Sequence, residues 1–215
     1  MKTSSPATLL AALAGLSLPM SAQNATLLRH AGNTDPLTEG WLVAMTGGGT
    51  STGAYSTGGA AAWFVSDQSN APGSYHGYNQ NLGACAAAVL AQSGWTMRVC
   101  LAINDPNLDG GATSIWFGYD TGTRRYDMRF TNTAAGGPIV MLMTGLGGTG
   151  GCGPSGFTYG VGTTGSCHVS GFHLFELVFD VAQQSATLSI DGVLTHSGYL
   201  GHPFGLGCCR RCESA

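Results

Sequence analysis

The stretch FHLFELVFDVAQQSATLSIDGVLTHSG, residues 172–198, decides the fold class of this chain. Apolar side chains recur at every second position through most of it, which is typical of a half-buried β-strand. Asp191-Gly192 then joins two such runs, and this dipeptide favours a tight two-residue hairpin because both central residues need a positive φ. The stretch therefore predicts strands over 172–180, 186–190 and 193–196.

Similar strand patterns recur upstream. We expect further strands over 41–45, 60–65, 95–103, 115–119, 124–130 and 139–143. Helical periodicity is nearly absent, and only the alanine-rich run 84–91 predicts one or two helical turns. The Gly/Ser/Thr-rich segments 47–59 and 145–165 predict loops. Many short strands at short spacing predict an all-β sandwich.

The composition excludes several classes of protein. Charged residues make up 9% of the 215 residues, hydrophobic residues 43%, and the net charge is −3. This apolar content is enough for a packed core and argues against full disorder. No internal apolar run reaches the roughly 18 residues of a membrane span. The 35 glycines lack a three-residue period, which excludes collagen, and the chain lacks the excess positive charge of a nucleic-acid binder.

The N-terminus predicts export. Lys2 precedes an apolar run over 7–18, and small residues follow around Ala22. This arrangement is that of a secretory signal peptide over residues 1–22. We therefore expect a secreted or cell-surface protein whose domain spans residues 23–207.

Export makes disulfides plausible. Cys85, Cys100, Cys152 and Cys167 lie in the body of the chain, and three further cysteines crowd the last eight residues. Pairing the four body cysteines in sequence order would close two loops of similar size. The other two connectivities of these four residues stay open.

Residues 172–198 resemble the closing part of a laminin-G-like domain. The resemblance rests on a strand ending in an acidic residue at 176–180 and on the hairpin motif that includes Ala186, Leu188, Ile190 and Asp191-Gly192-Val193. It extends loosely over residues 41–201. It implies a two-sheet antiparallel jelly-roll sandwich of the concanavalin A-like lectin/glucanase superfamily, a fold that hosts lectins, glycosidases and adhesion modules.

The C-terminus departs from that family. Laminin-G-like domains continue past the hairpin into a final strand, whereas nothing after Gly201 has a strand pattern here. We expect residues 208–215 to be an irregular Cys/Arg-rich tail, truncated or frame-shifted, that leaves an unpaired sheet edge.

Three motifs for catalysis or nucleotide binding lack their structural context. Gly49-Thr-Ser51-Thr-Gly53 matches a nucleophile elbow but is followed by no predicted helix. Gly145-x-Gly147-x-x-Gly150 matches a dinucleotide fingerprint and also precedes no helix. Glu176 and Asp180 share a strand face but do not form the E-x-D-x-x-E motif that the superfamily's glucanases carry. The sequence therefore favours a protein that is not an enzyme.

Three segments contain candidate binding residues. The aromatic and amide-rich run 75–81 predicts a loop in which Tyr75, Tyr78, Asn79 and Asn81 contact a glycan. Asp105, Asn107 and Asp109 match the first half of a calcium loop; a polar inter-strand loop is the favoured interpretation, and calcium is the most plausible cofactor if one is bound. Arg125, Asp127 and Arg129 share a strand face, where they either pair as surface charges or bind a carboxylate or sulfate.

These observations predict a secreted, non-catalytic module that recognises a carbohydrate or an extracellular protein. One alternative is a purely structural extracellular module without its own ligand. A second is an atypical glycoside hydrolase. We expect no nucleic-acid partner and no transmembrane segment.

Overall fold

The computed structural model describes residues 26–46, 50–57, 60–67, 75–102, 115–132, 138–146, 154–160 and 171–203. One α-helix, α1, spans Gly83–Ser93, and a short 3-10 helix, η1, spans Pro36–Glu39. The described strands are β1 (Leu42–Thr46), β2 (Thr50–Thr57), β3 (Ala60–Asp67), β4 (Tyr75–Asn79), β5 (Trp95–Leu101), β6 (Ile115–Asp120), β7 (Arg124–Asn132), β8 (Pro138–Leu146), β9 (Pro154–Gly160), β10 (His173–Asp180), β11 (Ser185–Ile190), β12 (Val193–Tyr199) and β13 (His202–Pro203).

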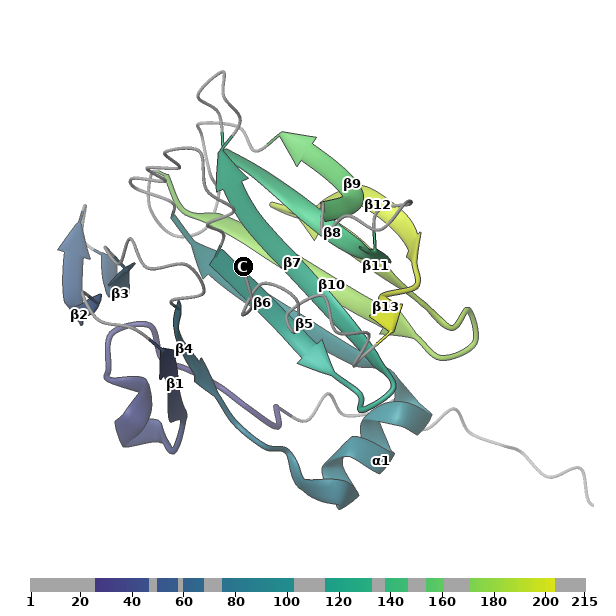
Figure 1. The fold of residues 1–215 in the computed structure, drawn as a ribbon, viewed down its shortest axis with the longest axis horizontal. Helices are drawn as coiled ribbons and strands as arrows, with labels where there is room; N and C mark the ends of the chain where they lie inside the picture. The colour runs from purple at the N-terminus through teal and green to yellow at the C-terminus, as the bar shows by residue number, and fades with distance from the viewer. Residues whose placement is uncertain are drawn as a thin grey trace, which may run out of the picture.

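The protein is an all-β antiparallel sandwich. One sheet has the strand order β12-β11-β10-β5, and the facing sheet contains β6, β7, β8, β9 and β13 (Figure 1). In the second sheet β7 pairs with β6, β8 and β13, so it lies at the centre. Two separate two-stranded ribbons, β1–β4 and β2–β3, lie beside the sandwich (Figure 1).

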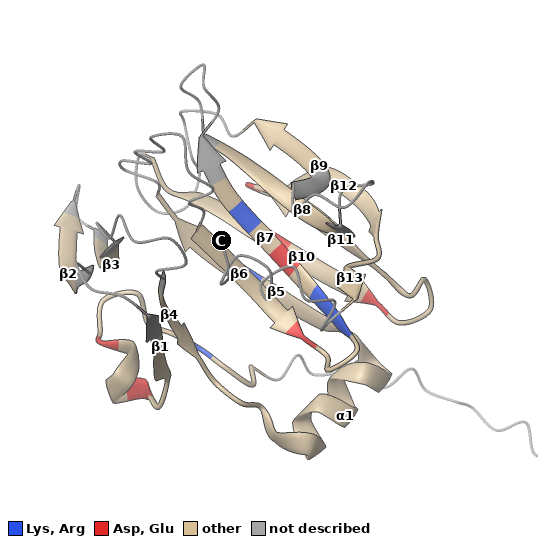
Figure 2. Ribbon diagram, viewed as in Figure 1, with Lys and Arg blue, Asp and Glu red and all other residues tan. Residues whose placement is uncertain are grey.

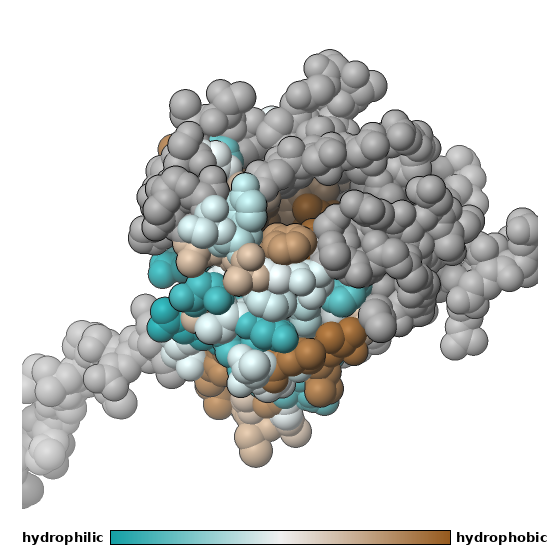
Figure 3. All heavy atoms as spheres, turned by 90° about the vertical axis from the view of Figure 1, so that its left-hand side faces the viewer, coloured by the Kyte–Doolittle hydropathy of each residue, from teal (hydrophilic) through white to brown (hydrophobic). Residues whose placement is uncertain are grey.

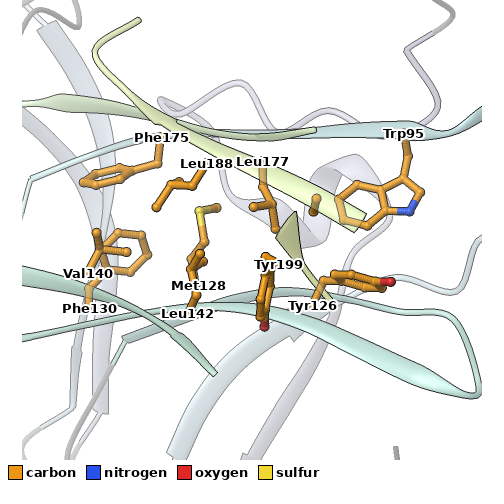
Figure 4. Packing of buried hydrophobic residues seen from close by; sticks show 11 residues of the cluster. Trp95, Tyr126, Met128, Phe130, Val140, Leu142, Phe175, Leu177, Leu188 and Tyr199 are labelled. Carbon is orange, nitrogen blue, oxygen red and sulfur yellow. The ribbon is translucent and has the colours of Figure 1, made fainter. Parts of the chain in front are cut away.

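The core lies between the two sheets and is rich in aromatic rings (Figure 4). It forms because every second residue of each strand points inward, as the alternating burial along β5 and β10 shows. Trp95 stacks on Phe179 at 5.5 Å between ring centroids, and Phe130 meets Phe175 edge to face at 4.7 Å. The buried cluster comprises Trp95, Tyr126, Met128, Phe130, Val140, Leu142, Phe175, Leu177, Ala186, Leu188 and Tyr199.

The chain crosses from one sheet to the other directly after Tyr199. Tyr199 ends β12, and its hydroxyl donates to the Met143 carbonyl at 2.7 Å on the facing sheet. Burial raises the pKa of Tyr199, so the hydroxyl stays protonated as a donor. Gly201 then turns with φ +66°, and a Cβ there would lie 2.7 Å from the Arg125 carbonyl. Only glycine fits this close approach, which brings β13 against β7.

A buried carboxylate marks the centre of the second sheet. Asp127 on β7 is 1% exposed; Arg125 Nε donates to its Oδ1 at 2.8 Å, and His202 Nε2 lies 3.0 Å from its Oδ2. Gly118 is its neighbour on β6, where a Cβ would collide with Oδ1. Asp127 was expected on a solvated strand face; that part of the prediction is wrong, because the strand neighbours enclose the carboxylate.

The predicted hairpin at Asp191-Gly192 is confirmed. Ile190 pairs with Val193, and both turn residues have a positive φ, +52° and +79°. The Asp191 side chain also accepts from the Leu174 amide at 2.9 Å and lies 2.7 Å from His173 Nδ1. The turn is therefore tied to the start of β10 as well as to its own strands.

Four segments differ from the expectations, one of them β4, which is described with the candidate site below. Residues 50–57 and 154–160, predicted as parts of loops, form β2 and β9, and residues 202–203 form β13. The sequences of β2, β9 and β13 lack a long alternation of apolar and polar residues. Each of these strands takes its register from the strand with which it pairs. Because β13 pairs with β7, the expectation that nothing after Gly201 forms a strand is wrong.

The predicted helix at 84–91 is confirmed and is longer than expected. α1 carries no charged residue, and Leu90 packs against the sandwich core. In the part of the chain that the structure describes, no helix is long and apolar enough to cross a membrane.

The contact at Asp127 gives a test of the fold. We expect Gly118→Ala to lower the free energy of unfolding by about 2 kcal/mol, because the new methyl group overpacks against Asp127. The matched control is Gly160→Ala on β9, where a Cβ meets nothing within 4 Å. Urea unfolding measures both; equal stability of the two variants would contradict this packing.

Candidate functional site: an aromatic cluster on the β1–β4 ribbon

The segment predicted as a glycan-binding loop is mostly a strand. Tyr75–Asn79 forms β4 and pairs antiparallel with β1, with Val43 opposite Tyr78 and Met45 opposite His76. Directly opposed residues share a face of a ribbon, and successive residues alternate between faces. Val43, His76 and Tyr78 therefore lie on one face, and Asn79 lies on the other.

Tyr78 connects this ribbon to its neighbour. Trp63 on β3 donates from Nε1 to the Tyr78 hydroxyl at 3.2 Å. The ring of His76 meets that of Tyr78 edge to face, at 5.3 Å between centroids and 78° between planes. Trp41 directly precedes β1 and continues the same alternation, two residues before Val43. We call Trp41, Trp63, His76 and Tyr78 the aromatic cluster.

The aromatic cluster contains polar atoms that are buried without a hydrogen-bond partner. They are Nε1 of Trp41 and both ring nitrogens of His76. All four residues of the cluster are half-buried rather than fully enclosed. Orphaned buried polar atoms are uncommon in folded proteins and call for a specific reason, such as an ordered water or a ligand. Figure 3 views the molecule from the side of the two ribbons and shows hydrophobic surface next to hydrophilic surface there.

The four predicted ligand-binding residues do not converge on one surface. Asn79 is exposed on the opposite face of β4 from Tyr78. Asn81 accepts from the Gly83 amide at 2.8 Å and so helps to start α1. Tyr75 begins β4, and its side chain is outside the described part. Of the four, Tyr78 is the residue that the structure places in the aromatic cluster.

Three members of the cluster were missed as site residues: His76, and also Trp41 and Trp63, which both lay within predicted strands. His76 stood inside the run 75–81 but was not selected, since a lone histidine carries no metal-ligand spacing. Trp63 lay within a predicted strand, yet the strand pattern does not say which other strand its side chain faces. Alternation along 75–79 would have separated Asn79 from Tyr78.

The charged face of β7 is a second candidate. Arg125 and Arg129 both lie over the indole ring of Trp116 on β6, at 5.3 and 4.1 Å from its centroid. Figure 2 shows basic and acidic segments alternating along β7. Asp120 lies opposite Arg125 on β6, so two arginines face two aspartates. This balance of charge favours internal pairing over the capture of an anion.

The two carboxylates considered for glycoside hydrolysis serve local contacts. Glu176 forms an ion pair with Arg98 across the β10–β5 pair. Asp180 accepts from the Ala182 amide at 2.7 Å in the following turn. Four residues of strand separate their backbones by about 13 Å, whereas the carboxyl groups of glycosidases lie about 5–9.5 Å apart.

The described residues include none of the three residues expected to bind calcium and only two of the four cysteines expected in disulfides. Asp105, Asn107 and Asp109 lie outside them, as do Cys152 and Cys167. Cys85 on α1 is a free, exposed thiol, while Cys100 on β5 is disulfide-bonded. In this structure Cys85, one of the four cysteines expected in disulfides, is therefore not the partner of Cys100. Among the described residues, no group of three or more His, Cys, Asp and Glu could hold a metal ion.

No protein-family model and no curated protein matches this chain.

The contact between Trp63 and Tyr78 can be tested by mutation. Tyr78→Phe removes one half-buried hydrogen bond and should lower the free energy of unfolding by about 1 kcal/mol. Tyr55→Phe on β2 is the control, since Tyr55 is 41% exposed and its described contact is the ring of Phe64. In thermal melts the control should unfold like the wild type. A Tyr78→Phe protein as stable as the control would argue against this hydrogen bond.

Proposed function

We propose that this chain is an exported, non-catalytic recognition module of laminin-G-like type that binds a carbohydrate at the aromatic cluster. The family assignment is supported by the resemblance of residues 172–198 and by the antiparallel sandwich that these residues build. Export is supported by the signal-peptide pattern at residues 1–22. The fold hosts many activities, so the ligand class is argued from the site alone.

The observation that carries the proposal is the combination of aromatic rings with orphaned polar atoms. Sugars present apolar C–H faces that pack on aromatic rings and hydroxyl groups that both donate and accept hydrogen bonds. Trp41 Nε1 is a donor, and an imidazole such as that of His76 offers, in its neutral form, one donor and one acceptor. A hydroxyl-rich ligand that reached these buried nitrogens would satisfy both kinds of group, whereas a purely apolar ligand would leave them unpaired.

The dimensions of the ribbon favour an extended ligand. Leu42, which follows Trp41, pairs with Asn79, so Trp41 lies near the level of Gln80. Four residues of strand then separate the level of Trp41 from that of His76, which is about 13 Å. Tyr78 lies between these two levels. An oligosaccharide lying along β4 could contact both ends, and a single small sugar could not.

Two conservative substitutions separate a binding role from a structural one. Trp41→Phe and His76→Phe keep an aromatic ring but remove the orphaned nitrogens. Because these nitrogens have no partner in the protein, neither variant loses a hydrogen bond, so His76→Phe should be at least as stable as the wild type and Trp41→Phe should lose only the packing of the larger ring. Each should nevertheless bind an oligosaccharide about tenfold more weakly, which corresponds to about 1.4 kcal/mol.

The experiment is a glycan array followed by calorimetric titration of the best oligosaccharide. Trp116→Phe is the control, because it makes the same type of change outside the aromatic cluster and should leave affinity unchanged. Equal binding by all three variants, or an array with no binding, would contradict carbohydrate recognition at this cluster. A blank array would favour the purely structural module, and turnover of a polysaccharide would favour the hydrolase.

A further inference from the structure

A tyrosine and a histidine close one edge of the sandwich. β9 carries Tyr159 and β12 carries His196, and within the described residues these strands are the outer strands of the two facing sheets. The Tyr159 hydroxyl lies 2.5 Å from His196 Nδ1. The Phe157 ring packs on the imidazole at 4.2 Å between centroids. The two sheets are thus bridged here by a polar contact and an aromatic contact.

These side chains point into the sandwich rather than away from it. Tyr159 pairs across the strands with Val140, and His196 pairs with Leu188. Val140 and Leu188 are both core residues with no exposed surface. Opposed residues share a face, so Tyr159 and His196 lie at the border of the same core.

The surroundings of His196 favour a neutral imidazole over a charged one. Nε2 of His196 is buried and has no hydrogen-bond partner. A neutral ring pairs through Nδ1 with Tyr159 and leaves one nitrogen unpaired. A protonated ring carries a donor on both nitrogens, and its positive charge would then lie in this desolvated site with no acceptor at Nε2.

No opposing charge compensates for this cost among the described residues. From β9 the titratable group facing His196 is Tyr159; β11 presents Leu188 at this position, and β12 itself carries no Asp or Glu. Burial alone shifts the pKa of His196, and it lowers it below the ordinary value of 6.5. Burial also raises the pKa of Tyr159, so its hydroxyl stays protonated over the pH range in which His196 titrates.

We propose that the Tyr159–His196 pair is an acid-opened latch between β9 and β12. At neutral pH the hydrogen bond and the tilted ring contact with Phe157 hold the two edges together. Protonation of His196 places a positive charge in this desolvated position and reverses the hydrogen bond, so that Nδ1 donates and the Tyr159 hydroxyl accepts. The cost of the enclosed charge loosens the contact and admits water to the edge of the core. The inference is independent of carbohydrate binding, because none of these residues belongs to the aromatic cluster.

The direction of the pH effect follows from linkage. The pKa of His196 is lower in the folded state than in the unfolded chain, so the unfolded chain binds the proton first as the pH falls. The contribution of His196 to stability is complete above pH 6.5 and decreases below it. The equilibrium constant for unfolding should rise by up to about tenfold for each pH unit between 6.5 and the folded pKa.

The test compares urea unfolding at pH 7.5 and pH 5.0 for the wild type and His196→Phe. The variant keeps a ring against Phe157 and cannot titrate, so it should lose less stability on acidification. His30→Gln is the control for removing a histidine, since His30 lies outside the sandwich, bonded to Glu39. This control should keep the acid-induced loss of the wild type.

Two measurements on the wild type keep the proposal testable if His196→Phe does not fold. Hydrogen exchange, corrected for intrinsic rates, should show lower protection of the β12 amides at pH 5.0 than at pH 7.5, with β10 unchanged. An NMR titration should place the pKa of His196 below 6.5, and Tyr159→Phe assigns the signal. A pKa at or above 6.5, or parallel pH profiles for the wild type and His196→Phe, would overturn the latch.

Discussion

The buried carboxylate of Asp127 is the constraint on which the sandwich depends. A charge this well enclosed is tolerated only with partners, and Arg125 and His202 supply them from β7 and β13. The same residue donates its backbone amide to the Tyr199 hydroxyl at 3.2 Å, which connects it to β12 of the facing sheet. Gly118 on β6 leaves the necessary space. Strands of both sheets are therefore in contact at Asp127, and the register of each strand is compatible with these contacts.

The strands that the sequence predicted well are those with one buried face. In β10 and β11 the apolar side chains of Phe175, Leu177 and Leu188 recur with a period of two, so pattern alone determines which face is buried. The turn at Asp191-Gly192 was equally predictable, because its backbone conformation demands those residues. β2, β9 and β13 lack such a pattern. They form because an adjacent strand offers hydrogen bonds, and that information is not local to their own residues.

The candidate site was predictable only in part. The abundance of aromatic residues near Tyr78 was visible, but a strand distributes its side chains over two faces, and this separates Asn79 from Tyr78. Trp63 reaches Tyr78 from another ribbon, so the contact depends on how the two ribbons lie together. On β7 the shared face of Arg125, Asp127 and Arg129 was predicted correctly. The enclosure of Asp127 depends on Gly118, whose role is visible only once β6 is placed opposite β7.

The closure of the sandwich by β13 has a consequence for how the chain folds. Asp127 and His202 are 75 residues apart in the sequence, and Arg98 and Glu176 are 78 apart. Contacts at such separations require large loops to close before they stabilise anything, so folding of this topology is slow. Neither sheet can be completed before residues 173–203 have been synthesised. During translation the earlier strands therefore remain with unpaired edges. Early binding of a chaperone at those edges would protect the chain from aggregation.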